Sequence, residues 1–527
     1  KPVSTSVIGS AVGFDPTRPV YQNYDGNVGL GYYMWMGVSN TPITLAASNP
    51  VSDLELADKQ NKTKRSIGNI ALDYKIHGFE DFRLNLNMGY DFLTEDKHDN
   101  MPDLAPAMYT GNEQDGTGKR YTYHNDKRNT LLDFYANYAK DFNDHNLNAM
   151  AGYGWQRFWY KNHDTTADTK GEDLTSPKHE EAELYLLSFY GRLNYSWKQR
   201  YMLTATLRAD ASSRFSPETR WGYFPSVAAA WRVNDEAFLA DNKVVSDLKL
   251  RLSYGQTGQQ SIGSYYQHLS TYTASYDESR YLFGNKWYTT YRPNGYDPNI
   301  KWETTETYNI GLDVTLLNGK LALTADAYIK NTNNVLLPIP YASSTGINGL
   351  SIQNAGQVQN KGIEISATWR SSIGDKANYY IGANLSTANN KVTEINAGGK
   401  YMSISGYSAH GAGGRGINMF KKGHSMSYFN LIETDGIFRS MEEIENYKNR
   451  KGELIQPGAQ VGDVRYKDWN GDGKIDTNDQ HDVGSPLPNF TFGLRLGGDW
   501  NNFDLNIFID GVAGNKIYNY PRYCLES

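Results

Sequence analysis

The chain has 527 residues, a formal net charge of -6 and a single cysteine, Cys524. The acidic balance without a basic face argues against a nucleic-acid-binding protein, and one cysteine excludes a disulfide framework and a thiolate metal cluster. Mean hydropathy is -0.64, and no apolar run has the roughly 20 residues of a membrane helix, so any membrane span must consist of strands.

Aromatic residues and glycine are abundant, at 13% aromatics, 40 Tyr and 50 Gly. Interfacial aromatic girdles, long wet loops and barrel kinks would raise these counts in a membrane barrel. A soluble, tyrosine-rich β-protein with an ordinary core would have a similar composition. Composition alone therefore leaves both classes open.

The start of the chain is rich in Gly, Asn and Tyr with little alternation, so we predict a long loop for residues 1–66. Lys1 opens directly into loop-like sequence and not into the signal peptide that an exported protein needs. The final NYPRYCLES contains no apolar strand that would close a barrel. We therefore expect this sequence to be part of a longer protein.

From residue 70 onward, apolar and polar residues alternate with a period of two in successive segments, which predicts about fourteen strands in about seven hairpins. The predicted pairs are 70–76 with 82–90, 132–138 with 147–155, 187–197 with 203–207, 222–233 with 247–258, 303–316 with 321–331, 363–369 with 379–385, and 490–500 with 503–509. Polar segments at 91–127 and 156–183 are predicted as loops between pairs.

The hairpin at 303–331 shows the pattern best. Apolar side chains from Tyr308 to Leu316 alternate with polar ones, and the chain returns with the same alternation after Asn318 and Gly319. These two residues favour the positive φ angles of a tight hairpin turn. Each strand is apolar on one face over roughly nine to eleven residues, the length that crosses a bilayer as a tilted strand.

Short turns alternate with long loops along the whole series. This arrangement is typical of an outer-membrane barrel, with short periplasmic turns and long extracellular loops. Four tryptophans fall near the short-turn ends of their strands, as expected for an interfacial girdle, although ordinary packing at strand ends would also place them there. They are Trp197, Trp231, Trp369 and Trp500. The predicted fold class is all-β, a transmembrane antiparallel β-barrel embedded in a lipid bilayer.

Several long blocks, in order along the chain, carry a family resemblance. They are GYFPSVAAAWRV (222–233), LKLRLSYGQTGQQSIGSY (248–265), KWETTETYNIGLDV (301–314), QNAGQVQNKGIEIS (353–366), TDGIFRS (434–440) and GDVRYKDWNGDGKIDTNDQHDVGSPLPNFTFGL (462–494). With these blocks the chain resembles the SusC/RagA family of TonB-dependent outer-membrane transporters.

The resemblance implies a barrel of about 22 strands filled by an N-terminal plug. About five strands would then precede residue 67 and about three would follow residue 511, so we expect 1–527 to be a partial barrel without its plug domain or N-terminal extension. It also implies a bacterial outer-membrane location, a SusD-like surface lipoprotein as partner, coupling to the TonB complex through the missing plug, and a dimer of such pairs.

The function implied is TonB-dependent import of an oligomeric nutrient, with oligosaccharide favoured over oligopeptide. The alternatives from other classes are a passive porin and a surface adhesin or scaffold. A porin would have no plug encoded upstream. Substrate would not compete with the binding of a protein partner to an adhesin or scaffold. The sequence contains no GxSxG elbow, no HExxH and no phosphate-binding Gly-rich loop followed by Lys, so we predict no enzymatic activity.

A calcium-type loop is predicted at 468–479, inside an extracellular loop at 440–488. Oxygen ligands at alternate positions around a Gly bend follow the order of an EF-hand loop, with the seventh ligand a backbone carbonyl. The predicted ligands are Asp468, Asn470, Asp472, Lys474 (carbonyl), Asp476 and Asp479. The twelfth position is Asp instead of the usual Glu, and the flanks are not helical, so a metal-free loop rich in Asx turns is the alternative.

Substrate contacts are predicted in the long loops at 259–302 and 396–430, where aromatic residues stand beside Asn, Asp and Arg. Such faces suit stacking on sugar rings or holding an extended peptide. The predicted residues are Tyr265, Tyr266, Tyr281, Trp287, Tyr288 and Tyr291. Packing of these rings between loops, or against a lid lipoprotein, is the alternative.

Polar residues on the strands are expected to face a wet interior; they are Arg192, Arg208, Arg251, Asp313 and Asp326.

Overall fold

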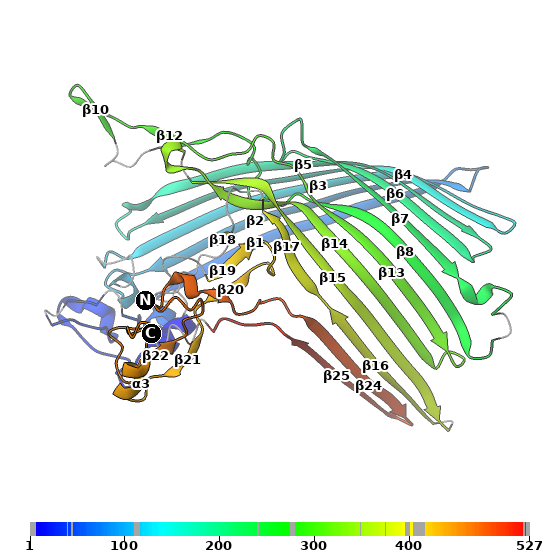
Figure 1. Ribbon diagram of the computed structural model, residues 1–527. Coiled ribbons are helices and arrows are strands. Elements are labelled where there is room, and N and C mark those ends of the chain that lie inside the picture. Colours follow the sequence, from blue (N-terminus) through cyan, green and yellow to red (C-terminus); the bar gives the residue numbers. More distant parts are fainter. Residues whose placement is uncertain are drawn as a thin grey trace.

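A computed structural model describes residues 7–38, 41–43, 46–109, 116–239, 242–274, 280–347, 349–374, 376–395, 401–403, 417–519 and 522. Antiparallel strands make up most of it, with short helices at the loop end (Figure 1). The helices are α1 (Val7–Gly13), α2 (Pro50–Glu55) and α3 (Met441–Asn446), and the 3-10 turns are η1 (Asp25–Gly31), η2 (Pro106–Tyr109), η3 (Val233–Asp235), η5 (Ser343–Thr345) and η6 (Thr477–Asp479). In this described part, no helix has the length and apolar character needed to cross a membrane.

One large antiparallel sheet contains all fourteen predicted strands, each hydrogen-bonded to its neighbours in chain order. Its strands are β1 (Asp58–Lys75), β2 (Phe82–Met101), β3 (Lys119–Phe142), β4 (His145–Ala167), β5 (Asp173–Trp197), β6 (Tyr201–Ser212), β7 (Trp221–Arg232), β8 (Val245–Gln259), β13 (Glu303–Leu316), β14 (Leu321–Pro340), β15 (Leu350–Ile373), β16 (Ala377–Thr387), β24 (Phe490–Trp500) and β25 (Phe503–Ala513). A further strand, β17 (Asn389–Ile395), pairs with β15. The strands form a curved wall (Figure 1).

The apolar face of the wall is exposed, as the alternation predicts. Ile310 on β13 stands beside Leu252 on β8 in the ladder, and the two side chains are 55% and 58% exposed. Exposed apolar area is unfavourable in water by about 25 cal/mol per Å², and a contiguous band of it suits lipid contact. We call this the outer face of the wall, and the opposite, mostly polar face the inner face.

Short turns lie together at one end of the wall. The turn between β13 and β14 has positive φ at Asn318 (56°) and Gly319 (88°), as predicted, and also at Leu317 (55°). Beside another short turn, Trp197 stacks on Tyr201 with ring centroids 5.5 Å apart, and Tyr201 stacks on Trp231 at 6.4 Å. These rings form a belt at the short-turn end of the apolar band.

The predicted loops at 91–127 and 156–183 are wrong over most of their length. Strands β3, β4 and β5 have 24, 23 and 25 residues, and the connection between β4 and β5 is only 168–172. The wall therefore continues beyond the apolar band on its long-loop side, where Figure 1 shows the long strands β3, β4 and β5. In this extension both faces meet water, so polar residues occupy both and the period-two signal disappears.

The prediction of one long loop for 1–66 is also wrong. This segment contains α1, η1 and α2, and β1 begins at Asp58. The helical turns pack on the connection between β2 and β3, where Met101, Ala105 and Met108 are buried with Leu30 and Leu56 beside them. Apolar side chains anchor this segment although they show no regular period.

The two longest connections fold into small sheets. Residues 260–302 contain β9 (Tyr272–Ala274), β10 (Tyr281–Phe283), β11 (Lys286–Tyr288) and β12 (Tyr291–Pro293). Residues 388–489 contain β18 (Tyr401–Ser403), β19 (Asn418–Lys421), β20 (Tyr428–Leu431), β21 (Thr434–Ile437), β22 (Val464–Tyr466) and β23 (His481–Asp482). Of the predicted loop 396–430, residues 396–400 and 404–416 lie outside the described residues.

Two buried apolar clusters attach these connections to the strand ends. The first contains Phe215, Phe224, Ile262, Ile300 and Trp302. The second contains Leu337, Ala355, Val358, Val392 and Phe420. The core of the molecule therefore lies at the long-loop end, because the spanning part of the wall has one face toward lipid.

Candidate functional site

A pocket of about 420 Å³ lies against the inner face of β3, β4 and β5, in the part of the wall beyond the apolar band. Its lining residues are Tyr123, Asn125, Lys127, Asn129, Phe158, Trp159, Tyr160, Asn162, Glu180 and Tyr265. The ladder places Lys127 opposite Tyr160 and Asn162 opposite Glu180, so these side chains share a face. Aromatic rings and amide or carboxyl groups thus alternate across three strands.

Hydrogen bonds fix part of this lining. The Tyr160 hydroxyl donates to Glu180 over 2.5 Å, and the Asn162 amide donates to the same carboxylate over 3.4 Å. Asn125 is only 2% exposed, and within the described part of the chain its side-chain oxygen accepts no hydrogen bond. A buried acceptor without a donor is costly, so a ligand hydroxyl or amide is a suitable partner for it.

Tyr265 reaches this pocket from the connection between β8 and β13. Its ring meets Tyr160 edge to face with centroids 5.6 Å apart, and the Arg214 guanidinium lies 4.6 Å from its ring centroid. Burial lowers the pKa of Arg214 from its ordinary value, and the guanidinium stays charged because that value is far above neutrality. The predicted residue Tyr265 is therefore held by a ring and a cation at the pocket wall.

Tyr266, the next predicted residue, faces the strand edge. Its hydroxyl accepts a hydrogen bond from the backbone N–H of Glu183 over 3.1 Å. This part of β5 extends beyond its pairing with β6, which begins at Leu186. Tyr266 therefore caps an unpaired strand edge and attaches the loop to the wall.

The other four predicted substrate residues are not brought to this pocket. Tyr281, Trp287 and Tyr288 lie on the β10–β11 hairpin and Tyr291 on β12, with exposed fractions of 61%, 60%, 47% and 66%. Figure 1 shows β10 projecting away from the wall, beyond β12. Tyr281, Trp287 and Tyr288 form an exposed aromatic hairpin, and Tyr291 lies on the neighbouring β9–β12 pair. The role of all four in substrate contact stays a prediction.

The predicted calcium loop is a compact turn rich in side-chain to backbone hydrogen bonds. Asp468 accepts from the N–H groups of Gly471 and Gly473, both at 2.8 Å. Asp479 is fully buried and accepts from the N–H groups of Trp469 (2.9 Å) and Asp476 (2.8 Å).

The remaining carboxylates of this loop also have partners. The Lys474 ammonium lies 2.7 Å from Asp476, and the Asn470 amide donates to Asp472 over 3.1 Å. Among the described residues, no three His, Cys, Asp or Glu side chains are grouped closely enough to hold a metal. The donor set is all oxygen, as calcium prefers, and Lys474 supplies the neutralising charge in this conformation.

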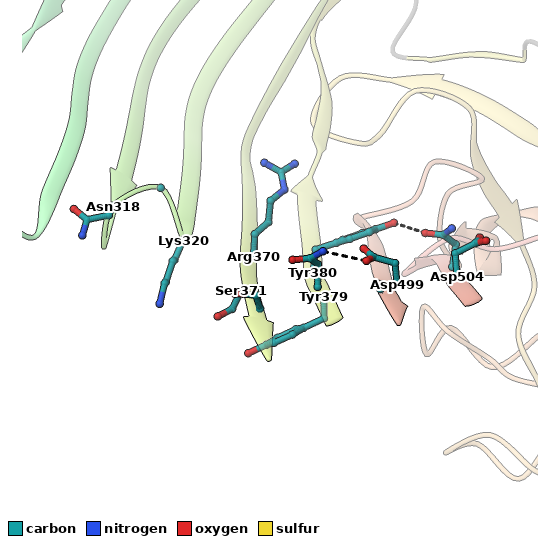
Figure 2. Close-up of a pocket in the computed structure, with 13 residues that line it drawn as sticks. Asn318, Lys320, Arg370, Ser371, Tyr379, Tyr380, Asp499 and Asp504 are labelled. Atoms are coloured by element: carbon teal, nitrogen blue, oxygen red, sulfur yellow. Dashed lines mark hydrogen bonds between the residues drawn. The ribbon is translucent and has the colours of Figure 1, made fainter. Parts of the chain in front are cut away.

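A second pocket, of about 530 Å³, lies at the short-turn end between the β13–β14 turn and strands β15, β16, β24 and β25. Figure 2 shows Tyr380 directed toward β24 and β25 and Tyr379 pointing the opposite way. The Tyr380 hydroxyl donates to Asn506 over 2.7 Å, and Asn378 donates to Asp499 over 3.0 Å. Lys320 and Arg370 also line this pocket, so it is polar and of mixed charge.

The β-barrel model of the TonB-dependent receptor-like family matches residues 8–523. The chain belongs to this family. The chain is similar to the TonB-dependent receptor SusC of Bacteroides thetaiotaomicron, with 30% identity, covering 97% of this chain and 50% of SusC. It is similar to the TonB-dependent receptor P26 of Formosa agariphila, with 29% identity over 97% of this chain and 50% of P26.

The wall also matches the structure of the RagAB peptide transporter, with a TM-score of 0.74, 20% identity, and coverage of 93% of this chain and 51% of that one. The resemblance to SusC and RagA, the antiparallel barrel fold and the outer-membrane location are thereby confirmed. Because SusC-like TonB-dependent receptors are transporters, the prediction that the chain is not an enzyme is confirmed as well. The chain spans about half the length of the curated relatives it matches.

Of the residues that line the inner-face pocket, the sequence pattern predicted only Tyr265. Its other residues lie in segments predicted as loops, where no apolar period marks a strand. Asn125, Lys127 and Asn129 lie on one face of β3, before residue 132, where the predicted strand began. They would have been found only if that strand had been extended toward its N-terminus.

Proposed function

We propose that this chain forms the barrel wall of a TonB-dependent transporter that imports an oligosaccharide across the bacterial outer membrane. The observation that supports it best is the pocket on the inner face of β3–β5, where Tyr160 and Tyr265 stand beside the amides of Asn125 and Asn162. Ring faces stack on sugars, and amide groups both donate to and accept from hydroxyls. Its position beyond the apolar band suits a substrate entering from outside.

An oligopeptide is the second candidate cargo. Lys127 and Glu180 give the same pocket one cation and one carboxylate, which a peptide carrying both charges would complement. The similarity in fold to the RagAB peptide transporter is compatible with this reading, at an identity too low to transfer a substrate. Glu180 already accepts from Tyr160 and Asn162, so only part of its hydrogen-bonding capacity remains for a ligand, which favours the less charged cargo.

The partners we propose follow from the family. A SusD-like surface lipoprotein would cover the long-loop end, and the exposed aromatic hairpin bearing Tyr281 and Trp287 is available to it or to substrate. TonB would act through a plug inside the barrel, and two such pairs would form a dimer. A passive porin or an adhesin would need neither a lid nor a plug.

The first experiment is gentle extraction of the complete transporter from the outer membrane, followed by mass spectrometry of co-purifying proteins and small oligomers. A lipoprotein together with a defined oligosaccharide is expected. A co-purifying peptide would show that the cargo is an oligopeptide and not an oligosaccharide. A barrel that is isolated alone and empty would contradict the transporter assignment.

Binding by the complete transporter then tests the pocket. Tyr265→Ala removes one ring, whose stacking contributes about 0.5–1.5 kcal/mol to binding. We therefore expect the Kd for the oligosaccharide to rise roughly two- to tenfold. Tyr281→Ala is the matched control, since it removes an equally aromatic side chain from the projecting hairpin. An effect of Tyr281→Ala alone would move the substrate site to the hairpin.

We also propose that the loop at 468–479 binds calcium in a structural role. Asp468, Asp472, Asp476 and Asp479, with the Asn470 side chain and the Lys474 carbonyl, would supply hard oxygen ligands to it. Chelation by EGTA is expected to speed proteolysis within 440–488 and to leave cargo binding unchanged. Equal proteolysis rates with EGTA and with calcium would contradict this proposal.

A further inference from the structure

Four polar side chains form a row across the outer face of the wall extension. Asp96 on β2 pairs with His124 on β3, His124 pairs with His163 on β4, and His163 pairs with His179 on β5. Directly paired residues of an antiparallel sheet share one face, so the row is continuous. On β5, His179 lies six positions past Tyr185, or roughly 20 Å along the strand, beyond the apolar band.

Two members of this row have unengaged rings. The His163 and His179 side chains are both exposed, and their ring centroids lie 6.1 Å apart at an interplanar angle of 57°. Within the described part of the chain, neither ring makes a hydrogen bond or an ion pair. His124 differs, because its Nδ1 lies 2.7 Å from Asp96 and its Nε2 lies 3.4 Å from Asp126.

The surrounding charge favours a cation. Asp96, Asp126 and Glu181 stand on the same face within two positions of the row. Lys161, two positions from His163, is paired with Glu181 at 3.6 Å, and Lys62 and Lys64 lie on β1, at the Asp96 end of the row. The two unengaged rings therefore stand next to each other beside these carboxylates, which favour a bound cation.

We propose that His163 and His179 form a surface site for a borderline divalent transition-metal cation such as Cu²⁺, Ni²⁺ or Zn²⁺. Neutral imidazole is the ligand that these ions share. Metal–nitrogen distances of about 2.0–2.1 Å put two coordinating ring centroids roughly 5–6 Å apart, so a small rotation of two exposed side chains closes the site.

The site is open and independent of the import pathway. The protein supplies two ligands, and water or an anionic group of a neighbouring molecule completes the coordination shell. The row lies on the outer face of the extension, whereas the pocket of Tyr160 and Tyr265 lies on the inner face, so metal binding and cargo binding are separable. An ion held by two imidazoles exchanges readily with the medium outside the cell.

The test is titration of the full-length transporter, purified in detergent without a histidine tag, with Cu²⁺ followed by electron paramagnetic resonance. We expect one equivalent of Cu²⁺ to bind at pH 7.5 and its spectrum to show hyperfine coupling to two nitrogen ligands. His163→Ala and His179→Ala should each abolish the two-nitrogen species.

Two histidine variants are matched controls. His124→Ala removes the neighbour that is already engaged by Asp96 and Asp126, and His77→Ala removes an exposed histidine in the turn between β1 and β2. Both should retain the two-nitrogen species. Absence of that species in the unmodified protein, its persistence in the His163→Ala, His179→Ala double variant, or its loss in His124→Ala would each overturn the proposal. Heat-modifiable electrophoretic mobility verifies that every variant is folded.

Discussion

Arg251 on β8 forms a bidentate ion pair with Asp313 on β13, with Nε to Oδ2 at 2.8 Å and Nη2 to Oδ1 at 3.0 Å. The same guanidinium reaches Asp326 on β14 at 3.0 and 2.9 Å. Gly311 makes room for it, because a Cβ at that position would lie 2.6 Å from the guanidinium carbon. One cation therefore ties three strands together on the inner face.

Arg251→Gln is expected to destabilise the barrel by leaving Asp313 and Asp326 beside each other without a cation. The three side chains are 31%, 32% and 18% exposed, so the loss is smaller than for a fully buried pair, about 1–3 kcal/mol. The measurement is urea unfolding of the transporter in detergent or lipid. Arg251→Gln combined with Asp313→Asn and Asp326→Asn should recover most of the loss, and no recovery would show that packing and not charge explains the effect.

Adjacent residues of β5 test the assignment of the two faces. Leu193 shares the outer face with Phe189, and Asn194 points to the inner face, where its amide oxygen accepts from Thr204. Leu193→Arg should cost about 2–4 kcal/mol near the bilayer midplane and reduce the amount of assembled protein in outer membranes. Asn194→Arg should assemble almost normally. Equal assembly of the two variants would contradict the assignment of the lipid face.

Gly473 tests the conformation of the acidic loop. Its φ is +90°, and a Cβ there would lie 2.6 Å from the Asn449 Cβ. Gly473→Ala is expected to cost about 1–3 kcal/mol of local stability and to speed proteolysis within 440–488. Gly452→Ala is the control, since its φ is +82° but its added Cβ meets nothing within 4 Å. The same rate in both variants would show that the contact with Asn449 is unimportant.

The same loop should loosen in acid. The hydrogen bond from Lys474, followed by that from the backbone N–H of Asn478, holds the pKa of Asp476 below its usual range. A folded-state pKa below the unfolded value of about 3.9 means that this contact stabilises the loop above pH 4 and is lost as pH falls through the folded pKa.

The measurement is hydrogen exchange of peptides covering 470–480, corrected for the intrinsic pH dependence of exchange. Protection is expected to be constant from pH 7 to about 4 and to fall below that value. Asp476→Asn removes the titrating group and should abolish the part of the fall that this residue causes. A loss of protection that begins near pH 6 would contradict the role assigned to Asp476.

The amino-acid pattern alone predicts the fourteen strands, their pairing within each hairpin that has a short turn, and the lipid-facing side. A period of two repeats wherever one face meets lipid, and antiparallel neighbours joined by short turns, such as that at Asn318 and Gly319, pair locally. These properties depend on residues near one another in the chain.

Only the folded structure shows the length of β3–β5, the helical turns within 7–57 and the grouping of residues at the two proposed binding sites. In the wall extension water lies on both sides, so no hydrophobic period marks the strands that carry Tyr160, His163 and His179. Tyr265 meets Tyr160 only because a distant loop docks on the unpaired edge of β5. Contacts between segments so far apart in the chain are set by packing, which a local pattern cannot specify.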